Sequence, residues 1–218
     1  MSIAPSDLPK DKAECVPPIP VPTLGSGGVF AVACSTSIAG PALASLEKVL
    51  DLPSYGSWNA FVPKASLKAA GPETKTETET EDETETETET ALPPELRAVV
   101  SRPGHVSPGA RIRFHPVMAP GGVDLEVTVL EAFDGGGPAG RGYRVAWKAV
   151  GMPSFLLRSE RVQEFVEHAM PDGTVETRYA CWETFGGWLA YVLPRGQLED
   201  GFTRWMNGLK KVVEEAGR

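Results

Sequence analysis

The sequence predicts an α+β fold in which a curved antiparallel sheet wraps around one long C-terminal helix. The first observation is that several segments after residue 110 alternate apolar and polar side chains between glycine-rich turns, the pattern of antiparallel strands. The second is the segment from about Gln197 to Ala216, which repeats apolar residues at helical spacing. So wide an apolar face must cover an apolar surface, and the sheet provides one. The repeating residues are Leu198, Phe202, Trp205, Leu209 and Val212.

The segment before the sheet predicts a first strand followed by two short helices. Val29–Ile38 is rich in small and β-branched residues after a glycine pair, which indicates a strand. Residues 40–52 place their leucines and valine on one helical face, with a proline suited to the first helical turn. Tyr55 and Trp58 follow at threefold spacing, which suits a further short helical turn. A second strand begins within residues 61–67.

Five later segments predict the remaining strands of the sheet. Each alternates in character and is bounded by glycine or proline. In the second of them, Val127 and Val129 are expected on the same face, with Thr128 on the other. The predicted strands span residues 111–118, 123–133, 143–150, 155–169 and 175–187.

Two segments are predicted to be disordered. Residues 1–26 are proline-rich and lack any helix or strand period, so we expect an extended arm. Residues 69–94 contain a Thr-Glu run, Glu73–Thr90, whose nine acidic residues repel one another and which offers no apolar face. The domain is therefore expected to span residues 27–217 with this acidic insertion in a loop. Two interpretations of the insertion stay open: a solvated spacer, or a docking segment for a basic protein partner.

The charge of the chain is concentrated in that run. The net charge is −8, but removing Glu73–Thr90 leaves 20 acidic residues (29 less 9) and 20 basic residues (21 less 1). A nearly neutral remainder argues against nucleic acid as a partner, since phosphate binding needs a concentrated excess of Lys and Arg. No run approaches the ~18 apolar residues of a transmembrane helix, and the N-terminus does not resemble a signal peptide.

The cysteines and histidines do not suggest a metal or cofactor site. The cysteines are odd in number and widely separated, which favours a reducing compartment, so we expect a cytoplasmic protein. We also expect a monomer. Neither residue type shows the spacing of zinc ligands or of a catalytic triad. The residues are Cys15, Cys34, Cys181, His105, His115 and His168.

The order of elements resembles the SRPBCC superfamily of START-like and polyketide-cyclase-like helix-grip proteins. The opening "VACSTSIAGPALASLEKVLDLPSYGSWNAFV" resembles its first strand and two short helices, and "YRVAWKAVGMP", "RSERVQEFVE" and "GFTRWMNGLKKVVE" resemble its later strands and closing helix. The resemblance covers roughly residues 29–67 and 111–215. It implies a cavity between sheet and helix that holds a lipid, sterol or polyketide. The acidic insertion and the proline-rich arm depart from the family pattern.

Three functions remain open at this stage. The first is binding, transport or sensing of a hydrophobic small molecule, without catalysis. The second is a cyclase or dehydratase-like enzyme with Glu183 as acid or base and Tyr179 as donor. The third is an interaction module that docks through the acidic insertion.

Strand parity nominates the residues of the site. It places Tyr179 and Glu183 on the face of the last strand that meets the helix, and Arg161 on the neighbouring strand is a feasible partner for Glu183. The pair could be a structural ion pair or could orient a ligand. The aromatic residues of the set could line a cavity or fill it as core. The candidate ligand-binding residues are Trp147, Arg161, Gln163, Tyr179, Glu183, Phe202, Trp205 and Met206, with Tyr55 and Trp58 at the cavity mouth.

Overall fold

The computed structural model describes residues 8–68, 92–135 and 140–217. In these residues one antiparallel sheet has the strand order β1-β2-β8-β7-β6-β5-β4-β3. Its strands are β1 (Glu14–Val16), β2 (Phe30–Ala39), β3 (Lys64–Leu67), β4 (Arg111–His115), β5 (Val123–Asp134), β6 (Arg141–Val150), β7 (Arg158–Ala169) and β8 (Val175–Gly186). The helices are α1 (Ala42–Leu50), η2 (Leu52–Ser54), α2 (Tyr55–Trp58), α4 (Pro94–Val100), η3 (Trp188–Val192) and α5 (Arg195–Ala216).

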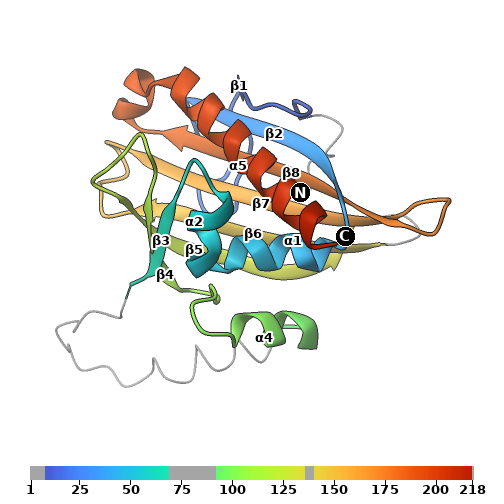
Figure 1. The fold of residues 1–218 in the computed structure, drawn as a ribbon. Helices are drawn as coiled ribbons and strands as arrows, with labels where there is room; N and C mark the ends of the chain where they lie inside the picture. The colour runs from blue at the N-terminus through green and yellow to red at the C-terminus, as the bar shows by residue number, and fades with distance from the viewer. Residues whose placement is uncertain (1–7, 69–91, 136–139, 218) are drawn as a thin grey trace.

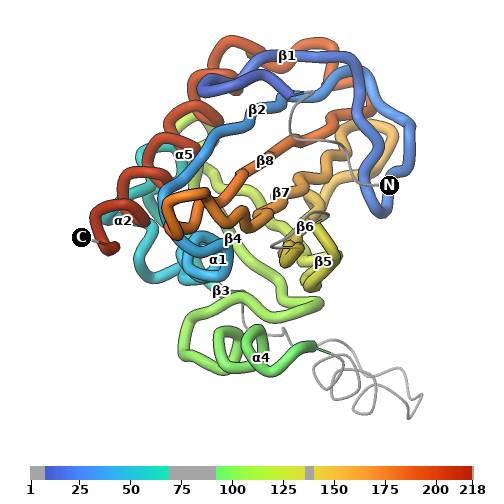
Figure 2. Tube along the Cα trace, turned by 90° about the vertical axis from the view of Figure 1, so that its right-hand side faces the viewer, coloured from blue at the N-terminus to red at the C-terminus, as the bar shows by residue number. Residues whose placement is uncertain are grey.

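The long helix α5 lies diagonally across the inner face of the curved sheet (Figure 1). The short helices α1 and α2 complete the same layer beside it, so the main core is the apolar layer between sheet and helices (Figure 2). The predicted α+β helix-grip fold is confirmed. The buried face of α5 matches the predicted one except that Val213, rather than Val212, is buried at its end. No helix in the described part of the chain combines the length and the apolar content needed to cross a bilayer.

Helix α5 packs against the end of α2 at Gly208, where a side chain would not fit. A Cβ on Gly208 would lie 2.3 Å from the Trp58 carbonyl oxygen, a backbone atom that cannot rotate away. We therefore expect Gly208→Ala to force the helices apart and to lower the free energy of unfolding by about 1–3 kcal/mol in urea denaturation. Gly196→Ala, in the same helix but with open space around the added Cβ, is the control. It should be neutral or stabilising by up to about 1 kcal/mol, and equal losses at both positions would contradict the close approach.

The N-terminal arm is more ordered than predicted. In the part that the structure describes, residues 8–26, Leu8 and Val21 are buried against the outer face of the sheet, whereas β1 pairs with β2 at the sheet edge and places Ala13 in the inner core beside α5 (Figure 2). The prediction of disorder is wrong for these residues because the outer face is itself apolar at Val162 and Trp182 and needs a cover. Residues 1–7 lie outside the described part of the chain.

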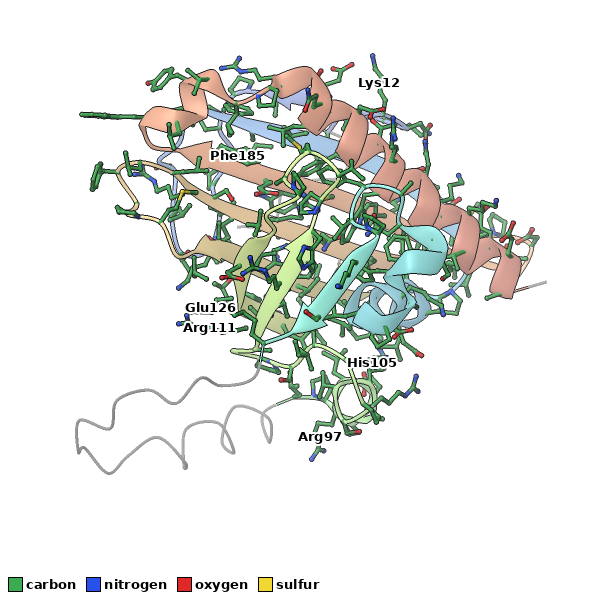
Figure 3. All side chains as sticks on the ribbon, turned by 60° about the vertical axis from the view of Figure 1, so that its left-hand side comes forward. Lys12, Arg97, His105, Arg111, Glu126 and Phe185 are labelled. Carbon is green, nitrogen blue, oxygen red and sulfur yellow. The ribbon has the colours of Figure 1, made fainter. Side chains whose placement is uncertain are left out.

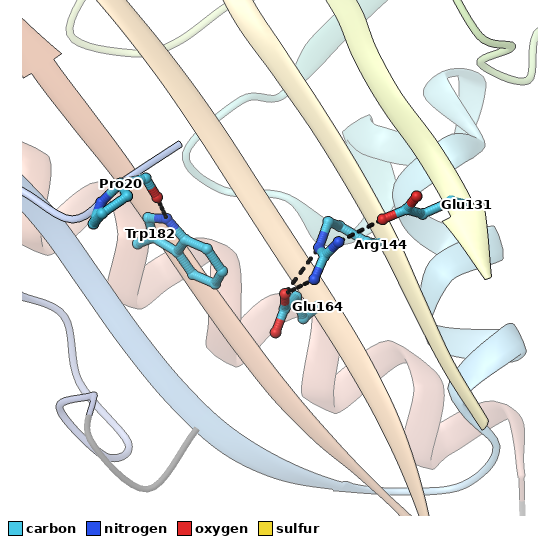
Figure 4. A network of polar contacts seen from close by, with 5 residues as sticks. All are labelled: Pro20, Glu131, Arg144, Glu164 and Trp182. Carbon is cyan, nitrogen blue, oxygen red and sulfur yellow. Dashed lines mark hydrogen bonds and ion pairs between the residues drawn. The ribbon is translucent and has the colours of Figure 1, made fainter. Parts of the chain in front are cut away.

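The outer face combines this cover with a partly buried ionic network (Figure 4). The Trp182 indole nitrogen donates to the Pro20 carbonyl at 3.2 Å, which fixes the arm to β8. On the neighbouring strands Arg144 donates to the buried carboxylate of Glu164 at 2.7 and 2.9 Å and also pairs with Glu131. The polar side chains of the outer face are therefore paired with one another or with the arm, and we assign them a structural role.

The acidic insertion is shorter than predicted at its C-terminal end. Residues 69–91 lie outside the described part of the chain, so the prediction of disorder there, and of a docking segment, stays a prediction. Residues 92–94, in contrast, belong to the fold: Leu92 is buried, and α4 begins at Pro94. The reason is that Leu96 and the following valines of α4 join the main core, which anchors the chain before them.

Two strand predictions are corrected by local geometry. A β-bulge between Val127 and Val129 shifts the register of β5 against β6, so Val127 joins the inner core while Val129 packs on the outer face. A bulge inserts one extra residue and inverts the parity beyond it. The second correction concerns the strand predicted from residue 155: β7 begins at Arg158, and Phe155 lies exposed on the preceding loop.

Candidate functional site

Four polar side chains lie together in the apolar layer beneath α5, and we call Arg161, Gln163, Tyr179 and Glu183 the interior polar cluster. The register of β7 against β8 makes Arg161 and Glu183 direct neighbours, as the sequence allowed. All four side chains are buried. Since they alternate with residues of the outer face, the pleat of the strands points them to the same side of the sheet.

Arg161 and Glu183 form a buried ion pair. The Arg161 Nε donates to the Glu183 Oε2 at 2.9 Å. The guanidinium also lies over the Phe202 ring, 3.9 Å from its centroid, and 5.1 Å from the Trp205 centroid. Burial opposes the charge of Arg161, but Glu183, together with Cys181 and Tyr179, outweighs it, and the pKa of Arg161 is raised. The guanidinium therefore stays charged among aromatic rings of α5.

The amide of Gln163 is oriented by two donors. Its Oε1 accepts from the Tyr179 hydroxyl at 2.7 Å and from the Trp205 Nε1 at 3.1 Å. Because the indole nitrogen can only donate, the atom that faces it must be the amide oxygen. Burial raises the pKa of the Tyr179 phenol well above its ordinary value, so the hydroxyl keeps its proton and donates. The two hydrogens of the Gln163 Nε2 take no part in these hydrogen bonds.

Two buried donors of the cluster find no acceptor in the described part of the protein. They are the Nη1 of Arg161 and the Nε2 of Gln163. Both belong to β7, two residues apart on the same face. Leaving a buried donor unpaired costs about 1–3 kcal/mol, and native proteins rarely do so. The arrangement suits a hydrogen-bond acceptor that is placed between the two donors.

Two thiols lie beside the cluster. Cys34 on β2 and Cys181 on β8 are opposite each other across the strand pair, and both are free and buried. Their mutual hydrogen bond and burial raise the pKa of Cys34. Burial also opposes ionisation of Cys181, but the hydrogen bond from Cys34 and the charge of Arg161 outweigh it and lower the pKa of Cys181. The sequence prediction did not include Cys34, although its alternation with Val32 signalled the same face.

An aromatic cluster around Trp205 forms one wall of the site. The Trp205 ring centroid lies 5.5 Å from those of Tyr55 and Trp58, 6.1 Å from Phe114 and 6.3 Å from Trp147, mostly edge to face. Tyr55 is fully buried and its hydroxyl donates to the Val49 carbonyl at 2.6 Å, so the structure places it in the core rather than at a mouth. Phe114 was not predicted for the site, although it shares the strand alternation of Ile112.

The cluster comes closest to solvent at one end of the sheet. Along β8 the exposed fraction rises from 0% at Tyr179 to 9% at Glu183, and along β7 it rises from 0% at Gln163 to 6% at Arg161. Arg161 and Glu183 lie three residues from Arg158 and Gly186, where β7 begins and β8 ends. A ligand that reaches the cluster would enter most directly from this end.

The three histidines lie apart from the cluster. His105 is on the segment that follows α4 (Figure 3), His115 is at the end of β4, and His168 is near the end of β7. Across residues 8–68, 92–135 and 140–217, no three His, Cys, Asp or Glu side chains gather in a way that could hold a metal ion. The chemistry of the site therefore has to be argued from the interior polar cluster.

The chain is similar to a curated protein and to several solved structures. No protein-family model matches it. "Oxopyrrolidines biosynthesis cluster protein O" of Penicillium oxalicum is 30% identical over 175 residues, which cover 73% of this chain and 72% of that protein.

Among solved structures, a hypothetical protein of Helicobacter pylori matches with a TM-score of 0.57 at 13% identity, covering 89% of this chain and 95% of the other. At this identity the structural match concerns the fold alone. An aromatase/cyclase of Streptomyces sp. R1128 also matches, with a TM-score of 0.47 at 13% identity, covering 86% and 95% of the two chains.

Proposed function

Because the chain belongs to the family of oxopyrrolidines biosynthesis cluster protein O and has the SRPBCC helix-grip fold, we propose that it binds an apolar small molecule beneath α5. The ligand would carry at least one neutral hydrogen-bond acceptor. Apolar burial, at about 25 cal/mol per Å², would supply most of the binding free energy. The interior polar cluster would fix the orientation of the ligand.

The observation that carries this proposal is the pair of unpaired buried donors. The Nη1 of Arg161 and the Nε2 of Gln163 belong to side chains on the same face of β7, and a carbonyl oxygen placed between them would accept from both. A neutral acceptor fits better than a carboxylate, because Glu183 already balances the charge of Arg161 and a second buried anion would be uncompensated. The name of the fungal relative is consistent with this class, since an oxopyrrolidine ring carries a neutral lactam carbonyl.

We assign Glu183 an orienting role in this proposal. Its carboxylate is engaged by the Arg161 guanidinium at 2.9 Å, and that contact directs the remaining guanidinium hydrogens into the layer. An acid or base catalyst has to reach the reacting atoms of a substrate, whereas this carboxylate is engaged by Arg161. Binding is therefore proposed ahead of the cyclase-like or dehydratase-like reaction.

A matched pair of probes tests the proposal. 2-Acetylnaphthalene and 2-ethylnaphthalene have similar size and shape, but the first carries a carbonyl oxygen. We expect titration calorimetry to give about tenfold tighter binding of the ketone, the value of one hydrogen bond to buried donors. Gln163→Met should reduce that advantage while leaving the affinity for 2-ethylnaphthalene nearly unchanged.

The same change at the exposed Gln197 is the control and should leave both affinities unchanged. The melting temperature of each variant would be recorded, since Gln163→Met also removes the acceptor of Tyr179 and Trp205. Equal affinity of the wild-type protein for the two probes would contradict a role for the buried donors.

A further inference from the structure

One end of the sheet carries most of the exposed apolar side chains. Three of the connections at that end are residues 116–122 between β4 and β5, residues 151–157 between β6 and β7, and residues 187–194 between β8 and α5. The antiparallel order of these strands places all three at the same end, on the left of Figure 1. They hold seven of the nine large hydrophobic side chains that are exposed in the described residues. We call these seven the apolar tip: Val117, Met152, Phe155, Trp188, Leu189, Tyr191 and Val192.

The apolar tip is built on a defined backbone. The amide of Trp188 donates to the Phe155 carbonyl at 2.9 Å, and the amide of Leu189 donates to the Leu156 carbonyl at 2.8 Å. Gly187 makes the turn between them with a φ of 89°, and a Cβ there would lie 2.6 Å from the Leu156 carbonyl oxygen. Two loops are thus tied together while Trp188 and Phe155 remain 73% and 59% exposed. The scaffold presents these side chains outward.

The connections that form the apolar tip are uncharged, and the charged residues that directly follow them are basic. The three connections contain no Asp, Glu, Lys or Arg, and the residues that directly follow two of them are Arg158 and Arg195. Arg195 is exposed, and its guanidinium lies 4.5 Å from the centroid of the Phe30 ring. Exposed Trp and Tyr with a basic rim are typical of surfaces that sit at the interface between lipid and water. Basic side chains at that level attract anionic headgroups.

We propose that the apolar tip docks on the surface of a lipid bilayer, with Trp188 and Tyr191 among the headgroups and Arg195 facing anionic lipids. The position of the interior polar cluster supports this partner, an argument that rests on the proposed function. Arg161 and Glu183 lie three residues from the strand ends at the tip, a distance of about 10 Å at 3.3 Å per residue. Docking would therefore place the most accessible end of the binding layer against the bilayer, from which an apolar ligand can enter without crossing water.

Sedimentation with lipid vesicles tests this inference. We expect the protein to bind vesicles of phosphatidylcholine and to bind more tightly when phosphatidylserine is included, with the added affinity removed by salt. Trp188→Ser/Tyr191→Ser should lower the partition coefficient at least tenfold, since each ring contributes a large apolar area. Leu67→Ser/Met170→Ser removes the two exposed apolar side chains that lie outside the tip and should leave partitioning unchanged.

Binding of 2-acetylnaphthalene without vesicles separates this inference from the proposed function. The tip variant should bind the probe as the wild-type protein does. If the wild-type protein binds the probe but no vesicle of either composition, the docking inference is overturned and the proposed function stands. Vesicle binding that is lost in the tip variant supports docking whether or not the probe binds. Concentration-dependent dimerisation that the tip variant abolishes, without vesicle binding, would assign the tip to a second copy of the chain and overturn the bilayer as its partner.

Discussion

Replacing Glu183 with alanine is expected to lower the free energy of unfolding by about 3–5 kcal/mol, because the change leaves a buried charge without its counterion. Arg161 is only 6% exposed, and its Nε donates to the Glu183 carboxylate at 2.9 Å. Its other neighbours include the faces of Phe202 and Trp205, which stabilise a cation far less than an anion does. Urea denaturation followed by tryptophan fluorescence would measure the loss.

The double variant Arg161→Met/Glu183→Leu is the matched control for this prediction. It removes both charges and fills the space with apolar side chains, so most of the stability lost in Glu183→Ala should return. Full recovery would also show that the ion pair contributes no net stability. That result is expected if the role of the pair is to orient a ligand. A Glu183→Ala protein as stable as the wild type would instead mean that water reaches Arg161 freely.

Strand parity predicted the inner face of β7 and β8 correctly because these strands pair without a bulge. The tight turn between them fixes the register. In this turn the hydroxyl and the backbone amide of Thr174 both donate to the Asp172 carboxylate. Once the register is fixed, every second residue faces the helix, and Arg161 meets Glu183 directly. The same reasoning failed on β5, where the bulge before Val129 has no marker in the sequence.

Other features depend on contacts that no local pattern encodes. The ordered arm has no period of its own; it is held by the Trp182 indole and by apolar outer-face residues that are distant in sequence. Likewise, the orientation of the Gln163 amide follows from the Trp205 indole, and only the placement of α5 across the sheet brings them together. The inner-face position of the interior polar cluster was therefore predictable from the sequence, whereas the two unpaired donors were not.

Replacing Trp205 with alanine is expected to cost about 3–5 kcal/mol of folding stability, the range for a large aromatic side chain in a core. The Trp205 ring packs against Tyr55 and Trp58 of the helical layer and against Trp147 of β6, so its loss removes contacts to helix and sheet together. It also removes one of the two donors to Gln163. Thermal and urea unfolding would measure the change, with coincident probes as the test of two-state behaviour.

Two further measurements show whether the aromatic residues line the layer or fill it. Trp205→Phe keeps an aromatic ring but loses the indole donor, so it should cost less than Trp205→Ala, with about 1 kcal/mol of its loss due to the hydrogen bond to Gln163. Indole, which restores both the ring and the donor, should raise the melting temperature of Trp205→Ala if the scaffold keeps the space open, as apolar cavities in rigid cores do. If indole has no effect, α5 has closed over the missing ring. A layer that closes in this way would admit a ligand only by moving the helix, which would make displacement of α5 part of binding.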